Sequence, residues 1–166
     1  MPTRDAGDED MVDGSQRQAP RALPVTLRPR NIRVVAYGLA ALIIATMVVL
    51  AVIMPPDWGV QDRVFLVLLG VAIGGGLHLL ARPRLELTRD RVTVVNPVRT
   101  HVLVWPEIID ARMPAGEPWP SVDLANGSTL AVMAIQSNDG DLARNNLAEF
   151  RRHLHERGEA AEPDRD

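Results

Sequence analysis

Residues 34–54 read VVAYGLAALIIATMVVLAVIM, a run without a single charged side chain. At 1.5 Å per residue, a helix of 21 residues spans about 31 Å, which matches the hydrocarbon thickness of a lipid bilayer. Pro55 and Pro56 follow directly and end the helix. The run is longer than the apolar region of a signal peptide, and it begins well inside the chain. We therefore expect residues 34–54 to form an uncleaved transmembrane helix.

A second apolar run, VFLVLLGVAIGGGLHLLA, occupies residues 64–81 after the short segment 55–63. As a helix it spans about 27 Å, which is the short end of the range for a membrane span. Gly70 and Gly74 form a GxxxG pattern, which lets a neighbouring helix approach closely. We expect these glycines to pack the two helices together as one hairpin. The alternative is a homo-oligomer, or a contact with a membrane helix of a partner.

Arginine is distributed unevenly around the two apolar runs. Four arginines precede the first run closely, and four follow the second run; they are Arg21, Arg28, Arg30 and Arg33, and then Arg82, Arg84, Arg89 and Arg91. The segment between the runs carries only Arg63, together with two aspartates. Because cytoplasmic flanks of membrane helices carry an excess of Arg and Lys, we expect both termini to be cytoplasmic in the plasma (inner) membrane. Segment 55–63 is then a short external turn.

The two ends of the chain are polar. Residues 1–33 hold a cluster of acidic side chains followed by the basic juxtamembrane stretch, and residues 158–166 are mostly charged or small. Neither segment has an apolar periodicity that would bury surface. We predict that both are disordered tails.

From residue 82 onward, apolar and polar residues alternate as they do in half-buried strands. Turn signals at 88–91, 96–97 and 126–127 divide this region into about six or seven short antiparallel strands. The Asn-Gly pair at 126–127 is the strongest hairpin signal, because both residue types tolerate a positive φ angle. The stretch GEPWP at 116–120 contains two prolines and predicts an irregular connection.

After Asp141 the apolar period becomes helical. Four apolar residues form a single stripe on this helix: Ala143, Leu147, Phe150 and Leu154. On its other faces we place Arg144, Glu149, Arg152 and Glu156, with His153 and His155 on the surface. The predicted fold is thus a two-helix transmembrane hairpin followed by a small, mainly-β PH-like domain over residues 82–157, closed by one C-terminal α-helix.

The chain resembles a known family over about residues 32–156. The most specific parts are RPRLELT at 82–88, VTVVNPVRTHVLVW at 92–105, and the Pro106 that follows. With the two preceding apolar helices and the closing helix, they are similar to the bacterial PH-like domain of the low-molecular-weight protein antigen 6 family, an actinobacterial and membrane-anchored group. The resemblance implies a PH-like fold at the membrane. It implies no catalytic residue, because none is assigned in that family.

Composition and motifs exclude several functions. The chain has no cysteine and no lysine, which removes thiolate metal sites, Cys nucleophiles, Schiff bases and the P-loop lysine. Its formal charge of −3 does not fit a nucleic-acid-binding domain. GxSxG, HExxH and GxGxxG are missing, and we see no metal-ligand spacing among the four histidines, including His78 and His101. We expect no catalysis, no cofactor, no metal and no nucleic-acid partner.

The remaining function is binding. We expect the domain to recognise a cytoplasmic or membrane protein, through a sheet edge or the groove beside the C-terminal helix. Trp105 and Trp119 are candidate contact residues because aromatic side chains dominate interfaces, although core packing is the alternative for both. Two other functions stay open. One is recognition of anionic lipid head groups by Arg82, Arg84, Arg89 and Arg91; the other is an accessory role in a cell-envelope transport or biosynthetic complex.

Overall fold

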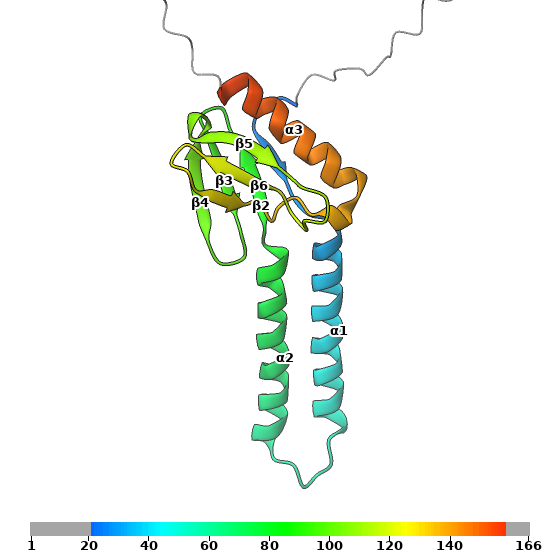
Figure 1. Cartoon of the computed structure of the whole chain (residues 1–166). Helices are drawn as coiled ribbons and strands as arrows, with labels where there is room; N and C mark the ends of the chain where they lie inside the picture. Colours follow the sequence, from blue (N-terminus) through cyan, green and yellow to red (C-terminus); the bar gives the residue numbers. More distant parts are fainter. Residues whose placement is uncertain (1–20, 159–166) are drawn as a thin grey trace, which may run out of the picture.

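The structure is a computed structural model that describes residues 21–158 (Figure 1). Two long antiparallel helices, α1 (Asn31–Ile53) and α2 (Val60–Ala81), stand side by side below a β-domain. Both helices are long and apolar enough to cross a membrane. α2 begins before its apolar run because the Asp62 carboxylate accepts the Gly59 N–H at 2.9 Å and caps the helix start.

Small residues set the contact between α1 and α2. A Cβ added at Gly70 would lie 3.0 Å from Met47 Cγ, and one added at Gly74 would lie 3.0 Å from Ile44 Cδ1. Both distances are closer than ordinary contacts, so the two glycines lie in the contact within the hairpin. Ala40 is buried opposite them.

The far end of the hairpin is tied by Arg63. Its guanidinium donates to the carbonyl oxygens of Ala51 (2.5 Å) and Met54 (2.7 Å) at the end of α1. These carbonyls have no partner within their own helix, because the last turn of a helix leaves its acceptors unpaired. The single arginine between the two apolar runs therefore closes the turn between α1 and α2.

The β-domain contains two antiparallel sheets and two 3₁₀ turns. The first sheet has the order β1-β2-β3-β4 and the second the order β5-β6-β7. The strands are β1 (Val25–Leu27), β2 (Arg84–Leu87), β3 (Arg91–Val95), β4 (Thr100–Val104), β5 (Ile108–Arg112), β6 (Ser121–Leu124) and β7 (Thr129–Ala131). The 3₁₀ turns are η1 (Trp105–Glu107) and η2 (Ser137–Asp139). The predicted antiparallel architecture and its turns are confirmed.

The N-terminal boundary of the domain differs from the prediction of a disordered segment up to residue 33. Val25–Leu27 forms β1 and pairs with β2, with Val25 opposite Leu87 and Leu27 opposite Leu85. The sequence does not predict β1, because a strand of three residues is too short to show an alternation of apolar and polar residues. Its partner strand β2 also comes much later in the chain, after both helices. The rest of the predicted tails, residues 1–20 and 159–166, lies outside the described residues.

The core lies between the two sheets and α3 (Asp141–Gly158), which lies along the β-domain in Figure 1. All four residues of the predicted stripe are buried in it: Ala143, Leu147, Phe150 and Leu154. The prediction that the C-terminal helix closes the strand layers is therefore confirmed.

Three polar residues of α3 are buried, Asn146, Glu149 and His153, against the prediction that Glu149 and His153 face solvent. The exposed fractions of Glu149 and His153 are 2% and 3%. Glu149 Oε1 accepts the backbone N–H of Arg21 at 2.6 Å and also lies 3.3 Å from His153 Nε2, while Oε2 pairs with Arg152. The partner that covers Glu149 comes from the segment before α1, which the helical period alone cannot reveal. His155 is exposed, as expected.

The β-domain also holds the start of α1. Asp139 in η2 accepts the backbone N–H groups of Arg30 (2.9 Å) and Asn31 (2.8 Å) through its two carboxylate oxygens. The Asn31 side chain donates in turn to the Asn138 carbonyl at 2.8 Å. An acidic side chain at this position suits the unpaired N–H groups and the positive end of the helix dipole. The cap of α1 is thus supplied by a residue more than a hundred positions away in the chain.

Candidate functional site

A groove of about 540 Å³ lies between α3 and the segment formed by η1 and β5. β5 is an edge strand, because it pairs only with β6 and α3 lies along its other side. The groove is lined by Pro106, Ile108, Ile109, Asp110, Arg151, Leu154 and His155. It occupies the place where we expected a groove beside the C-terminal helix.

Ile109 is the apolar residue that the groove presents most openly. It is 66% exposed, whereas its neighbour Ile108 is 3% exposed. The pairing of β5 with β6 shifts register between Ile108 and Asp110, so Ile109 is the extra residue of a β-bulge. A bulge turns a side chain out of the regular alternation. The sequence carries a signal for this bulge, because two adjacent isoleucines break the period of two that a regular half-buried strand shows.

The polar residues of the groove favour side-chain docking over strand addition. The Ala111 carbonyl already accepts the Arg151 Nε–H at 2.7 Å, and the Ala111 N–H donates to Asp110 Oδ1 at 2.8 Å. At this position the edge of β5 therefore has no free backbone group to offer an added strand. The groove instead combines the exposed Ile109 with one acidic and one basic side chain, Asp110 and Arg151.

Trp105 is not the exposed contact residue that we predicted. It is 3% exposed, its indole Nε1 donates to the Thr88 carbonyl at 3.1 Å, and its ring lies 6.5 Å from that of Phe150. The chain turns inward at η1, so the indole fills the space between the β2–β3 turn and α3. Core packing is therefore its role.

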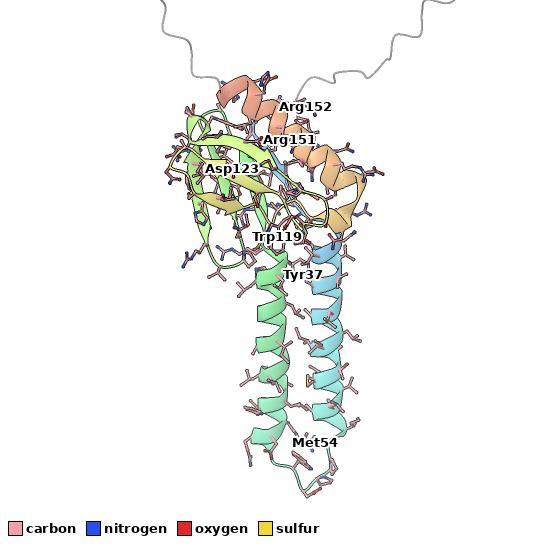
Figure 2. All side chains as sticks on the ribbon, viewed as in Figure 1. Tyr37, Met54, Trp119, Asp123, Arg151 and Arg152 are labelled. Atoms are coloured by element: carbon pink, nitrogen blue, oxygen red, sulfur yellow. The ribbon has the colours of Figure 1, made fainter. Side chains whose placement is uncertain are left out.

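Trp119 is half-buried in the connection between β5 and β6. Figure 2 shows it at the end of the domain that adjoins the helices, away from Arg151 of the groove. The structure therefore does not bring the two predicted tryptophans together in one site.

The structure also divides the four arginines that we predicted as one lipid-binding cluster. Arg82 follows α2, and Arg84 begins β2, where its Nε lies 2.6 Å from Glu86 Oε1. Arg89 and Arg91 lie beyond the other end of β2. That end is roughly 13 Å from Arg84, because a strand rises about 3.3 Å per residue. The C-terminal end of α3 reaches that turn through an Arg157 hydrogen bond to the Arg89 carbonyl. The four side chains do not form a single site.

No metal centre emerges from the part of the chain that the structure describes. Among residues 21–158, no group of three or more His, Cys, Asp or Glu side chains is arranged to hold an ion. His78 lies against Tyr37, with 3.2 Å between Nδ1 and the phenolic oxygen, and His101 is half-buried on β4 opposite Val94.

Comparison with known proteins agrees with this fold. A family model described as a bacterial PH domain matches residues 82–153. An uncharacterised protein of Mycobacterium bovis is 32% identical over 130 residues, which cover 75% of this chain and 84% of the relative. Uncharacterised proteins from two strains of Mycobacterium tuberculosis match with the same values. No solved structure gives a significant match. The narrower resemblance to the low-molecular-weight protein antigen 6 family stays a prediction.

Proposed function

Because this chain belongs to the bacterial PH domain family, we propose that it is a membrane-anchored module that holds a protein partner at the cytoplasmic face of the plasma membrane. The observation that carries the proposal is the groove between β5 and α3, on a domain that is joined to the two apolar helices at three points. Two are short chain links, from β1 into α1 and from α2 into β2, and the third is the Asp139 cap on α1.

The exposed surface of α1 and α2 supports a bilayer as their surroundings. Large apolar side chains point outward along both helices, and Val35, Leu42 and Phe65 are 64%, 63% and 68% exposed. Nothing within residues 21–158 covers this surface. Soluble proteins rarely expose an apolar patch that runs the length of two helices.

The groove offers the chemistry of a small protein-recognition site. An apolar side chain of the partner packs between Ile109 and the α3 residues that line the groove, and Asp110 and Arg151 present charges of both signs for polar contacts. Because the helices confine the domain to the membrane plane, even a weak site meets a membrane-associated partner at high effective concentration.

The natural absence of cysteine allows one experiment to test membrane topology and groove together. In intact cells, a membrane-impermeant maleimide should label Asp57→Cys in the turn between the helices. Ser128→Cys, in the β6–β7 turn, should react only after permeabilisation. The opposite pattern would place the domain outside and contradict the proposal.

The same cysteines report on the partner. On inside-out membranes, a benzophenone maleimide attached at Pro106→Cys, which lines the groove and leaves Ile109 in place, should give an adduct of one defined size, and the same reagent at Ser128→Cys should not. Both positions are exposed, and only position 106 lines the groove. Equal adducts at the two positions, or none at position 106, would show that the groove is not the contact surface.

A further inference from the structure

We propose that a second pocket, at the start of α1, binds the phosphate-bearing head group of an anionic phospholipid; this inference rests on the membrane anchoring proposed above. The pocket has a volume of about 450 Å³. It is lined by Arg28, Pro29, Arg30, Arg33, Val34 and Tyr37. It lies where the polar segment of the chain meets the apolar surface of the helices.

The pocket carries uncompensated positive charge. Within residues 21–158, none of the guanidinium groups of Arg28, Arg30 and Arg33 forms an ion pair. Asp139 is the acidic side chain beside the helix start, and its two oxygens are occupied by the backbone N–H groups of Arg30 and Asn31. The backbone at the helix start is therefore already satisfied, and the three arginine side chains are the groups that an anion would meet.

A fourth arginine lies at the same level. The contact between Tyr37 and His78 sets the alignment of the two antiparallel helices. Arg33 lies one turn before Tyr37, and Arg82 lies one turn after His78, so both lie at the end of the hairpin that adjoins the domain. Arg82 is exposed and has no acidic partner among the described residues. By contrast, Arg84 is neutralised by Glu86.

The apolar side of the pocket, formed by Val34 and Tyr37, distinguishes a lipid from a free anion as the ligand. Val34 and Tyr37 are 66% and 42% exposed, and both belong to the apolar surface of α1. Figure 2 shows Tyr37 at the top of the helix pair, directly below the β-domain. A free phosphate would use the arginines and leave this wall bare. A phospholipid also covers it with its glycerol and first methylene groups, so we assign the pocket to the lipid.

The chain supplies its own matched control. Arg89 and Arg91 are two exposed arginines close in sequence that lie away from the pocket, at the turn between β2 and β3. Substituting Arg28 and Arg33 by glutamine changes the net charge by the same amount as substituting Arg89 and Arg91. Only the first pair lines the pocket.

The test uses the full chain purified in an uncharged detergent, with dioleoyl phosphatidylglycerol, dioleoyl phosphatidylcholine or inorganic phosphate added in turn. Native mass spectrometry counts the bound molecules. We expect one phosphatidylglycerol to bind about tenfold or more tightly than phosphatidylcholine. The double variant Arg28→Gln/Arg33→Gln should lose that preference, and Arg89→Gln/Arg91→Gln should keep it. Thermal unfolding without lipid checks that both variants are folded.

Three results would overturn the inference. Equal binding of the two lipids would mean unselective lipid around the helices, and equal losses in the two double variants would mean diffuse surface charge. Binding of inorganic phosphate that displaces the phosphatidylglycerol at similar concentration would make the pocket a site for free anions. Carbonate extraction serves as the control for membrane anchoring. If all variants stay in the membrane after this treatment, a change in lipid binding does not come from a failure of anchoring.

Discussion

Phe150 on α3 is the residue whose removal should cost the β-domain most. It is 0% exposed and packs against Trp105 in the core. A buried phenylalanine removes about 150–250 Å² from water, and alanine retains the smaller part of that area. At roughly 25 cal/mol per Å², the lost burial is about 2–3 kcal/mol. The cavity left behind brings the expected loss in unfolding free energy for Phe150→Ala to about 3–5 kcal/mol.

The measurement needs the full chain, because β1 comes from before the helices. Urea unfolding in mild detergent can be followed by the fluorescence of Trp105 in a chain where Trp58 and Trp119 are replaced by phenylalanine. Asn145→Ala, on an exposed position of α3, is the control and should cost under about 0.5 kcal/mol. Arg152 is unsuitable, because it pairs with the buried Glu149. If Phe150→Ala unfolds at the same urea concentration as the control, α3 does not close the core and the fold is wrong.

Two further predictions concern carboxylates that join distant segments. Asp139→Ala should lower the stability of the joint between α1 and the domain by about 1 kcal/mol, seen as faster amide hydrogen exchange at Asn31, and Asp139→Asn should lower it less. Unchanged exchange would show that Asp139 is not the cap. Burial alone would raise the pKa of Glu149, but the Arg21 N–H and the Arg152 guanidinium outweigh it and hold that pKa below its ordinary value. Ionised Glu149 therefore contributes its full stabilisation of the folded state above the carboxyl pKa of the unfolded chain, and this contribution is lost as the pH falls through the lower pKa of the folded chain. A Glu149→Gln variant whose free energy of unfolding falls equally with pH would contradict this prediction.

The elements that sequence reasoning predicted are those whose signals are local. The apolar runs, the alternation after residue 82 and the turn residues all act within a few positions of one another. Gly127 is an example, because its φ of +81° is a left-handed conformation that glycine favours, whereas Asn126, the other residue of the predicted turn, does not adopt a positive φ. β1 has no such signal, since its three residues are recognisable as a strand only when β2 lies beside them.

The buried face of α3 was predicted only in its apolar half. Glu149 and His153 lie beside Phe150 and Leu154 on the helix surface, so the buried face is wider than the hydrophobic stripe. A buried carboxylate is tolerated only with partners, and here one partner is a backbone N–H from the segment before α1. From side-chain polarity alone, Glu149 and His153 are expected to face solvent. Their burial becomes evident only from the contact with the segment before α1.

The candidate groove lies where the outline of the fold predicts a groove, but its lining residues were not predicted. A groove beside a C-terminal helix follows from the outline of the fold, whereas its most exposed apolar residue, Ile109, depends on a one-residue bulge. For Trp105 the residue type could not decide between core and surface, because a large aromatic gains from burial in either setting. The indole hydrogen bond to the Thr88 carbonyl decides it.

Neither end of α1 is capped from within the helix, and this determines how the domain is held. Arg63 satisfies the carbonyls at one end, and Asp139 satisfies the N–H groups at the other. Asp139 lies two residues before α3, which lines the groove through Arg151. A rotation of the domain away from the helices would expose the unpaired N–H groups of α1 and cost the capping free energy. The contact that completes α1, together with the short chain links from β1 into α1 and from α2 into β2, therefore fixes the direction in which the groove faces relative to the helix axes.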